Sequence, residues 1–227
     1  MFYNDYYSLT LLLPLLILSL IMQAVMKATY SKYSKVFSTK GMTGAAVARS
    51  ILESAGIYDI SVEVVDGNLS DHFDPARRVI RLSSEVYNGS SVSAVGVAAL
   101  ETGHALQYAS GYFPMTLRSS IVGITNFSSK LLYILMILSF VISLPLLCDI
   151  AVICFAVLFF FQLVTLPVEF NASSRAIKQI EQLGYSSDEI SSVKKVLTAA
   201  AMTYVVAMLY SLGQLITFFS RTRNRRR

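Results

Sequence analysis

A glutamate and a histidine lie three residues apart in a stretch that is otherwise apolar or uncharged. Residues 91–107 read SVSAVGVAALETGHALQ, and Glu101 and His104 are the only titratable side chains among them. An Ala-rich apolar run of this length is typical of a buried helix. A buried carboxylate and imidazole cost free energy unless they are paired or bind a metal. These two residues are therefore the first candidates for chemistry.

The pair matches part of a zinc-peptidase helix. In such a helix, histidines at positions i and i+4 bind the metal from one face, and a glutamate at i+1 takes a proton from the metal-bound water. Glu101 and His104 occupy the positions of the glutamate and the second histidine, and Leu100 occupies the position of the first. By spacing alone, a hydrogen-bonded polar pair in a protein core explains the two residues as well.

The sequence around this helix resembles the YugP-like family of membrane-bound neutral zinc metallopeptidases. Members of that family carry a His-Glu-x-Gly-His-Ala-x-Gln helix where residues 98–107 of this chain read AALETGHALQ. The resemblance covers most of the chain, because several spaced blocks follow one another in the family order. These blocks are residues 43–49 (TGAAVAR), 71–75 (DHFDP), 79–83 (VIRLS), 85–89 (EVYNG) and 166–176 (LPVEFNASSRA).

The resemblance implies a membrane zinc endopeptidase with zinc as its cofactor and a peptide or protein near the membrane as its substrate. It implies that Glu101 is the general base and that His104 and Glu169 are zinc ligands. The sequence is compatible with this, because Glu169 directly follows an apolar run that returns the chain to the side of His104.

Leu100 departs from the family pattern. Catalytic zinc takes three protein ligands and keeps one position open for water, whereas Leu100 offers no lone pair. We therefore expect weak or absent zinc and impaired hydrolysis. Two explanations stay open: a substitution introduced to inactivate the enzyme, or a natural pseudopeptidase that serves as a membrane binding or scaffold protein.

His72 and Asn171 are further candidates for the cleft. His72 is the other histidine of the chain and is a substitute for the missing ligand, although a structural role in the turn before a strand is the favoured interpretation. Asn171 stands where we expect aspartate in close relatives. Loss of a carboxylate that orients a ligand imidazole would weaken metal binding further.

Long apolar runs predict about four transmembrane helices that position these residues. About 20 apolar residues span a hydrocarbon core of about 30 Å. Pro145, Cys148 and Asp149 separate the second run from the third, which predicts a helical hairpin with a turn at 145–150. The N-terminus has no basic residue, which favours an uncleaved anchor over a signal peptide. The runs are residues 9–26, 131–147, 150–168 and 196–219.

The polar sequence between the first two runs predicts a small α+β region. A helix is expected across 41–56, strands at 61–65 and 78–82 that form a β-hairpin, and a short helix capped by Ser83. The predicted fold is thus mainly α and integral to the membrane, with a small zincin-like region. Its expected parts are an anchor (1–26), a metallopeptidase-like region (27–130), a transmembrane hairpin (131–168), the Glu169 segment (169–195), a C-terminal transmembrane helix (196–219) and a basic tail (220–227).

Charge and composition narrow the function classes. Only 15% of the residues are charged, against about a quarter in soluble domains. The net charge of +5 is spread over the edges of apolar runs, which argues against a nucleic-acid partner and for contact with the lipid bilayer. Lys and Arg are concentrated in 27–130 and 169–195, which predicts a multi-pass cell-membrane protein with both segments in the cytoplasm. A transporter is disfavoured, because the only candidate for an intramembrane charge is Asp149, which is expected in the turn between two apolar runs.

Overall fold

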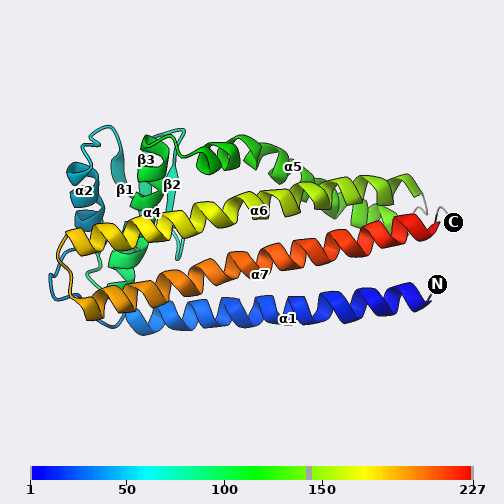
Figure 1. The fold of residues 1–227 in the computed structure, drawn as a ribbon, viewed down its shortest axis with the longest axis horizontal. Coiled ribbons are helices and arrows are strands. Elements are labelled where there is room, and N and C mark those ends of the chain that lie inside the picture. Colours follow the sequence, from blue (N-terminus) through cyan, green and yellow to red (C-terminus); the bar gives the residue numbers. More distant parts are fainter. Residues whose placement is uncertain (1, 142–144, 226–227) are drawn as a thin grey trace. The chain divides into compact units, whose positions relative to one another are not determined.

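The computed structural model describes residues 2–141 and 145–225, which are mainly helical (Figure 1). They divide into two compact units. The elements are α1 (Phe2–Tyr33), α2 (Gly44–Ser54), β1 (Ser61–Val65), β2 (His72–Asp74), β3 (Val79–Ser83), α3 (Ser84–Asn88), α4 (Val92–Ala109), α5 (Phe113–Val141), α6 (Pro145–Gln182) and α7 (Ser187–Arg225).

The first unit is a helical bundle, made of Met1–Gln23, Leu117–Leu166 and Thr203–Arg227. A small glycine lets α1 and α7 approach each other in this unit, since a Cβ on Gly213 would lie 2.8 Å from Leu15 Cδ1. The buried core joins α5, α6 and α7 through Leu132, Leu135, Leu147, Ala151, Cys154 and Phe155, with Leu215 and Phe218 packed against them.

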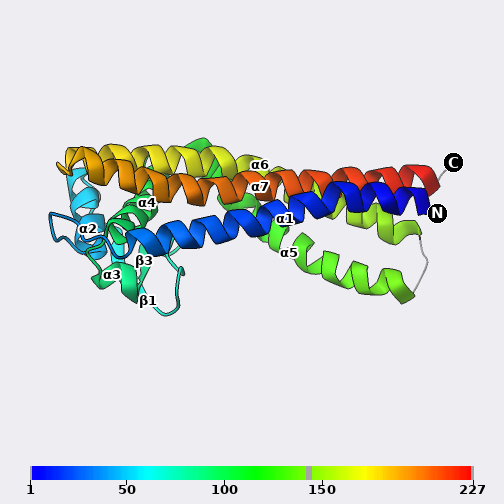
Figure 2. The ribbon, with the colours of Figure 1, turned by 90° about the horizontal axis from the view of Figure 1, so that it is seen from below.

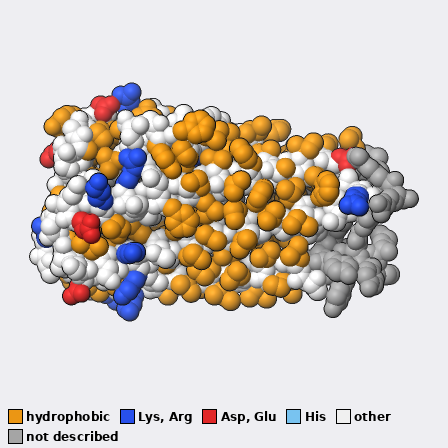
Figure 3. Space-filling model, viewed as in Figure 1, with side chains coloured by type: hydrophobic (Ala, Val, Ile, Leu, Met, Phe, Trp, Pro, Cys, Tyr) orange, Lys and Arg blue, Asp and Glu red, His pale blue; other side chains and the backbone are white. Residues whose placement is uncertain are grey.

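Three helices among the described residues are long and apolar enough to cross a membrane: Leu9–Tyr33, Leu146–Gln182 and Ser187–Ser220. They contain the first, third and fourth predicted runs. The predicted second run, 131–147, is divided between α5 and α6, and its residues 142–144 lie outside the described residues. Hydrophobic side chains gather over the long helices on the face drawn in Figure 3, as expected of surface that meets lipid.

The predicted turn at 145–150 is wrong. Residues 145–150 belong to α6, so Asp149 is helical. Helix α5 ends at Val141 and α6 begins at Pro145, and residues 142–144 lie outside the described part of the chain. Pro145 is the first residue of α6. Proline suits that position, because its fixed φ is helical and its missing N–H would have had no helical partner there.

The second unit holds the polar sequence and the ends of three long helices, Ala24–Thr116 and Pro167–Met202. Its sheet has the order β1-β3-β2. The predicted strands exist, but they do not form a hairpin with each other: β1 pairs with β3 in parallel, and the antiparallel partner of β3 is β2. Parallel pairing needs a crossover of about a dozen residues, and the segment between β1 and β3 supplies it while adding β2 at the far edge.

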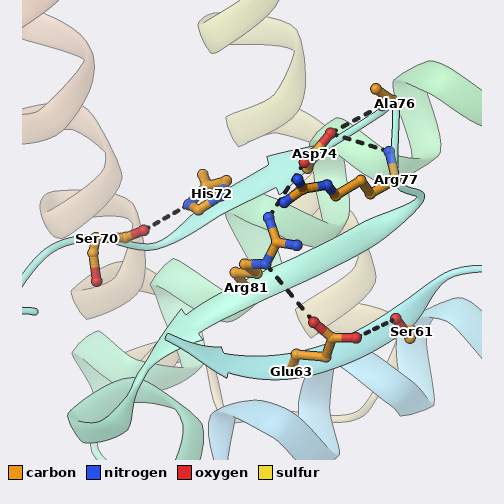
Figure 4. Close-up of polar contacts among 8 residues, drawn as sticks. All are labelled: Ser61, Glu63, Ser70, His72, Asp74, Ala76, Arg77 and Arg81. Atoms are coloured by element: carbon orange, nitrogen blue, oxygen red, sulfur yellow. Dashed lines mark hydrogen bonds and ion pairs between the residues drawn. The ribbon is translucent and has the colours of Figure 1, made fainter. Parts of the chain in front are cut away.

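Arg81 links the three strands of this sheet (Figure 4). Its guanidinium lies 3.3 Å from the carboxylate of Asp74 on β2 and 3.7 Å from that of Glu63 on β1. Ser83 ends β3. The sequence predicted that it caps the short helix α3, but its side chain makes no capping hydrogen bond. Its hydroxyl donates to the Asp71 carboxylate instead, at 3.1 Å.

Helix α4 is the centre of the second unit and begins as predicted, with the Ser91 hydroxyl accepting from the Ala94 N–H. Gly103 allows a close approach to α6, because a Cβ there would lie only 2.6 Å from the carbonyl oxygen of Ala172. Figures 1 and 2 show α4 beside the yellow part of α6. One buried cluster packs α4 against α2, α6 and α7, and a second packs it against the sheet.

Candidate functional site

His104 of α4 and Glu169 of α6 face each other inside the second unit. The distance from His104 Nε2 to Glu169 Oε2 is 3.5 Å, and the side chains are only 7% and 4% exposed. The close α4–α6 approach at Gly103 makes this juxtaposition possible. The structure therefore brings together the imidazole and the carboxylate that the family resemblance implied as zinc ligands.

Glu101 is buried in the same part of α4. Burial raises the pKa of its carboxyl group above the ordinary value, and the nearby carboxylates of Glu169 and Asp71 raise it further. The His104 imidazole and the Phe73 backbone N–H act in the opposite direction. A carboxyl group in such surroundings holds a proton at a higher pH than an exposed glutamate does, which is the property of a group that accepts and returns protons.

Gln107 is a further residue of the site, to which the sequence analysis assigned no role. It is fully buried, and its amide oxygen lies 3.1 Å from His104 Nδ1. Its amide nitrogen donates to the Val168 carbonyl at 2.8 Å and to Asn171 Oδ1 at 3.0 Å. The available signal was a glutamine three residues after His104, on a helix whose buried residues are mostly small or apolar.

Asn171 contacts Gln107 and Arg175. Its Oδ1 accepts from Arg175 Nε at 2.8 Å as well as from Gln107. Arg175 also donates to the Leu106 carbonyl at 3.3 Å, and its guanidinium lies 5.8 Å from the centroid of the Tyr112 ring. The imidazole of His104 is thus held by Gln107, and Asn171 acts on it through Gln107.

Leu100 lies one helical turn before His104 and is half-buried. It packs against the buried cluster that includes Val95 and Ala99. Val97 packs instead against the cluster on the sheet side of α4. The position that carries a histidine in the zinc-peptidase pattern therefore contributes an apolar contact here.

His72 lies on the edge strand β2, where its exposed ring has Nδ1 2.7 Å from the Ser70 carbonyl oxygen (Figure 4). Within residues 2–141 and 145–225, no three His, Cys, Asp or Glu side chains form a group that could hold a metal ion. His104 and Glu169 offer two donors, whereas a catalytic zinc takes three protein ligands. The residues present therefore do not complete such a site.

Comparisons with known proteins agree with the sequence motifs. Residues 8–223 match a family described as "Putative neutral zinc metallopeptidase". The chain is 47% identical over 197 residues to "Putative membrane protease YugP" of Bacillus subtilis (strain 168), a match that covers 86% of this chain and 88% of that protein. No solved structure matches the chain.

Proposed function

Since this chain belongs to the family of neutral zinc metallopeptidases, we propose that it is a membrane-embedded peptidase whose cleft is formed by Glu101, His104 and Glu169. We further propose that Leu100 leaves this cleft with one metal ligand too few, so that hydrolysis is weak or lost. The substrate class is a peptide or protein segment close to the membrane surface.

One contrast supports the proposal. His104 Nε2 and Glu169 Oε2 stay within 3.5 Å of each other in a buried site, although Leu100 contributes only apolar contacts. Burying a carboxylate costs free energy of folding unless the carboxylate is paired, hydrogen-bonded or bound to a metal. The two remaining metal donors of the family pattern, His104 and Glu169, are therefore in place, and Leu100 stands at the position of the third.

His104 and Glu169 are the proposed metal-facing residues, and Glu101 is the proposed proton acceptor. Its raised pKa suits that role, because a general base works best when its pKa is near the working pH. With two protein donors, a metal would be held weakly. We therefore expect Glu101, His104 and Glu169 to contact a peptide but to cleave it slowly or not at all.

A membrane protein that binds peptide segments in this cleft without cleaving them is the second candidate. The apolar contacts of Leu100 favour it, because they stabilise the site without a metal. The two candidates differ in what happens when the missing donor is supplied, since a retained catalytic apparatus responds with hydrolysis.

The test is the Leu100→His variant, compared with the unchanged chain and with Leu100→Phe, which adds a ring without a donor nitrogen. We expect Leu100→His to bind about one zinc per chain and to cleave fluorescently labelled casein. Zinc at 100 times its dissociation constant should stabilise this variant by about 2.7 kcal/mol and raise its melting temperature, with no such effect in Leu100→Phe.

Glu101→Gln in the Leu100→His background separates binding from catalysis. It should still bind zinc but lose about 10²–10⁴-fold in rate, the usual cost of losing a general base. Zinc restored without any cleavage by Leu100→His would favour the binding protein. Stoichiometric zinc and full cleavage by the unchanged chain would overturn the proposal.

A further inference from the structure

Four polar side chains form a continuous hydrogen-bonded chain between α6 and α4. It runs from Arg175 to Asn171, then to Gln107, then to His104, with donor–acceptor distances of 2.8, 3.0 and 3.1 Å. Gln107 is fully buried and His104 is 6% exposed. Water therefore has little access to the two inner members, and their partners are the protein groups around them.

The direction of each hydrogen bond in this chain follows from its ends. Arg175 has donors and no acceptor, so the atom of Asn171 that faces it must be the oxygen. The amide nitrogen of Gln107 then faces that oxygen and also the Val168 carbonyl, which can only accept. The amide oxygen of Gln107 is thereby turned to His104 Nδ1, and two acceptors cannot bond each other, so Nδ1 must carry a proton.

We propose that Gln107 is a positioning residue, which keeps Nδ1 of His104 protonated and turns Nε2 toward Glu169. The ring cannot turn over without presenting carbon to the Gln107 oxygen, and the amide cannot flip without facing Asn171 and Val168 with an acceptor. Leaving a buried polar group without a partner is destabilising, so both reversals are disfavoured. The hydrogen-bonded chain thus determines which nitrogen of His104 faces Glu169.

This inference rests on the proposed function only in assigning His104 and Glu169 to one cleft. The tautomer is a property of the protein without metal and without substrate. It can therefore be measured in a chain that hydrolyses nothing, and its failure would be distinct from a failure of the proposed peptidase activity.

The experiment is nitrogen-15 NMR of histidine side chains in the full chain, purified in detergent and stripped of metal with a chelator. The chain has 2 histidines, so His72→Gln leaves His104 as the single source of signal. At a pH where the ring is neutral, we expect a protonated-type shift for Nδ1 and a lone-pair-type shift for Nε2. The reverse pattern, or an average of the two tautomers, would overturn the proposal.

Gln107→Met then tests whether Gln107 is the cause. Methionine keeps the length of the side chain but has no amide oxygen, so we expect His104 to lose the fixed Nδ1–H pattern and to move toward the Nε2–H tautomer. Gln182→Met, at an exposed position of α6, is the matched control and should leave the spectrum unchanged. A folded Gln107→Met protein with an unchanged His104 tautomer would refute the role. If that variant does not fold, the spectrum of the unchanged chain still decides the tautomer.

Discussion

Gly103 sets the spacing on which the candidate site depends. It directly precedes His104, and a Cβ at this position would lie 2.6 Å from the backbone oxygen of Ala172. Backbone atoms of a packed helix cannot yield as the end of a flexible side chain can. The absence of a side chain at Gly103 therefore lets α4 come close enough to α6 for His104 to face Glu169.

Gly103→Ala should destabilise the protein and separate the two helices. Overpacking of this kind costs about 1–3 kcal/mol, and it outweighs the gain of about 1 kcal/mol that alanine otherwise brings to a helix. Thermal unfolding followed by circular dichroism measures the change. Gly123→Ala is the control, since nothing lies within 4 Å of a Cβ on that helical residue. Equal stability of both variants would contradict the assigned role of Gly103.

At the scale of residues, spacing was sufficient to select Glu101 and His104, and the family resemblance added Glu169. The structure brings all three together. The helical repeat fixes how Glu101 and His104 are related, and the end of an apolar run indicates where Glu169 emerges. The role of Gln107 was not predictable in this way. It depends on the Val168 carbonyl and on Asn171, which another helix supplies.

At the scale of elements, helices were predicted more reliably than strand pairing. Helix α2 begins after the Thr43 cap and is followed by Gly56, whose φ of +70° suits glycine. These signals are local. The pairing of β1 with β3 is not local, because it depends on the path of the chain between them, and β2 has only 3 residues, too few for a readable alternation.

The turn between β2 and β3 should make stability depend on pH in acid. The Arg77 N–H, together with the Ala76 N–H and Arg81, lowers the pKa of Asp74 below its ordinary value of 3.8, against the effect of burial. A group whose pKa is lowered by folding stabilises the protein above its unfolded pKa and loses this contribution as the pH falls through the folded pKa. Unfolding measured at a series of acidic pH values should show that loss.

Asp74→Asn removes the titrating group while keeping an oxygen that accepts from the turn. We expect it to be less stable than the unchanged chain at neutral pH, with a gap that closes as the pH falls below the ordinary pKa of aspartate. Asp66→Asn, at an exposed loop position, is the matched control. A gap that stayed constant with pH would mean that the Asp74 carboxylate does not stabilise the turn through its charge.

At the scale of the whole molecule, the long helices are long and apolar enough to cross a membrane and to extend beyond it. A hydrocarbon core of about 30 Å takes about 20 helical residues, whereas α6 has 38 residues and α7 has 39. Each helix therefore has a lipid-facing part and a polar part, and Glu169 lies on α6 after its most apolar stretch. If α7 also crosses once, the Arg-rich end of the chain lies on the side opposite to Ser187.

The final prediction is that residues 27–130 and 169–195 lie on one side of the membrane, the cytoplasmic side, where most of the Lys and Arg residues of the chain are. The test uses variants with one cysteine each, made after native Cys148 and Cys154 are replaced by serine and alanine.

Glu85→Cys and Lys178→Cys, both at exposed positions, report on the two segments, and Leu146→Cys reports on the other end of α6. A membrane-impermeant maleimide should label positions 85 and 178 only when the cytoplasmic face is open, and position 146 only from outside. Opposite accessibility of positions 85 and 178 would be incompatible with the pairing of His104 and Glu169, since residues of α4 and α6 on different sides of a bilayer cannot meet.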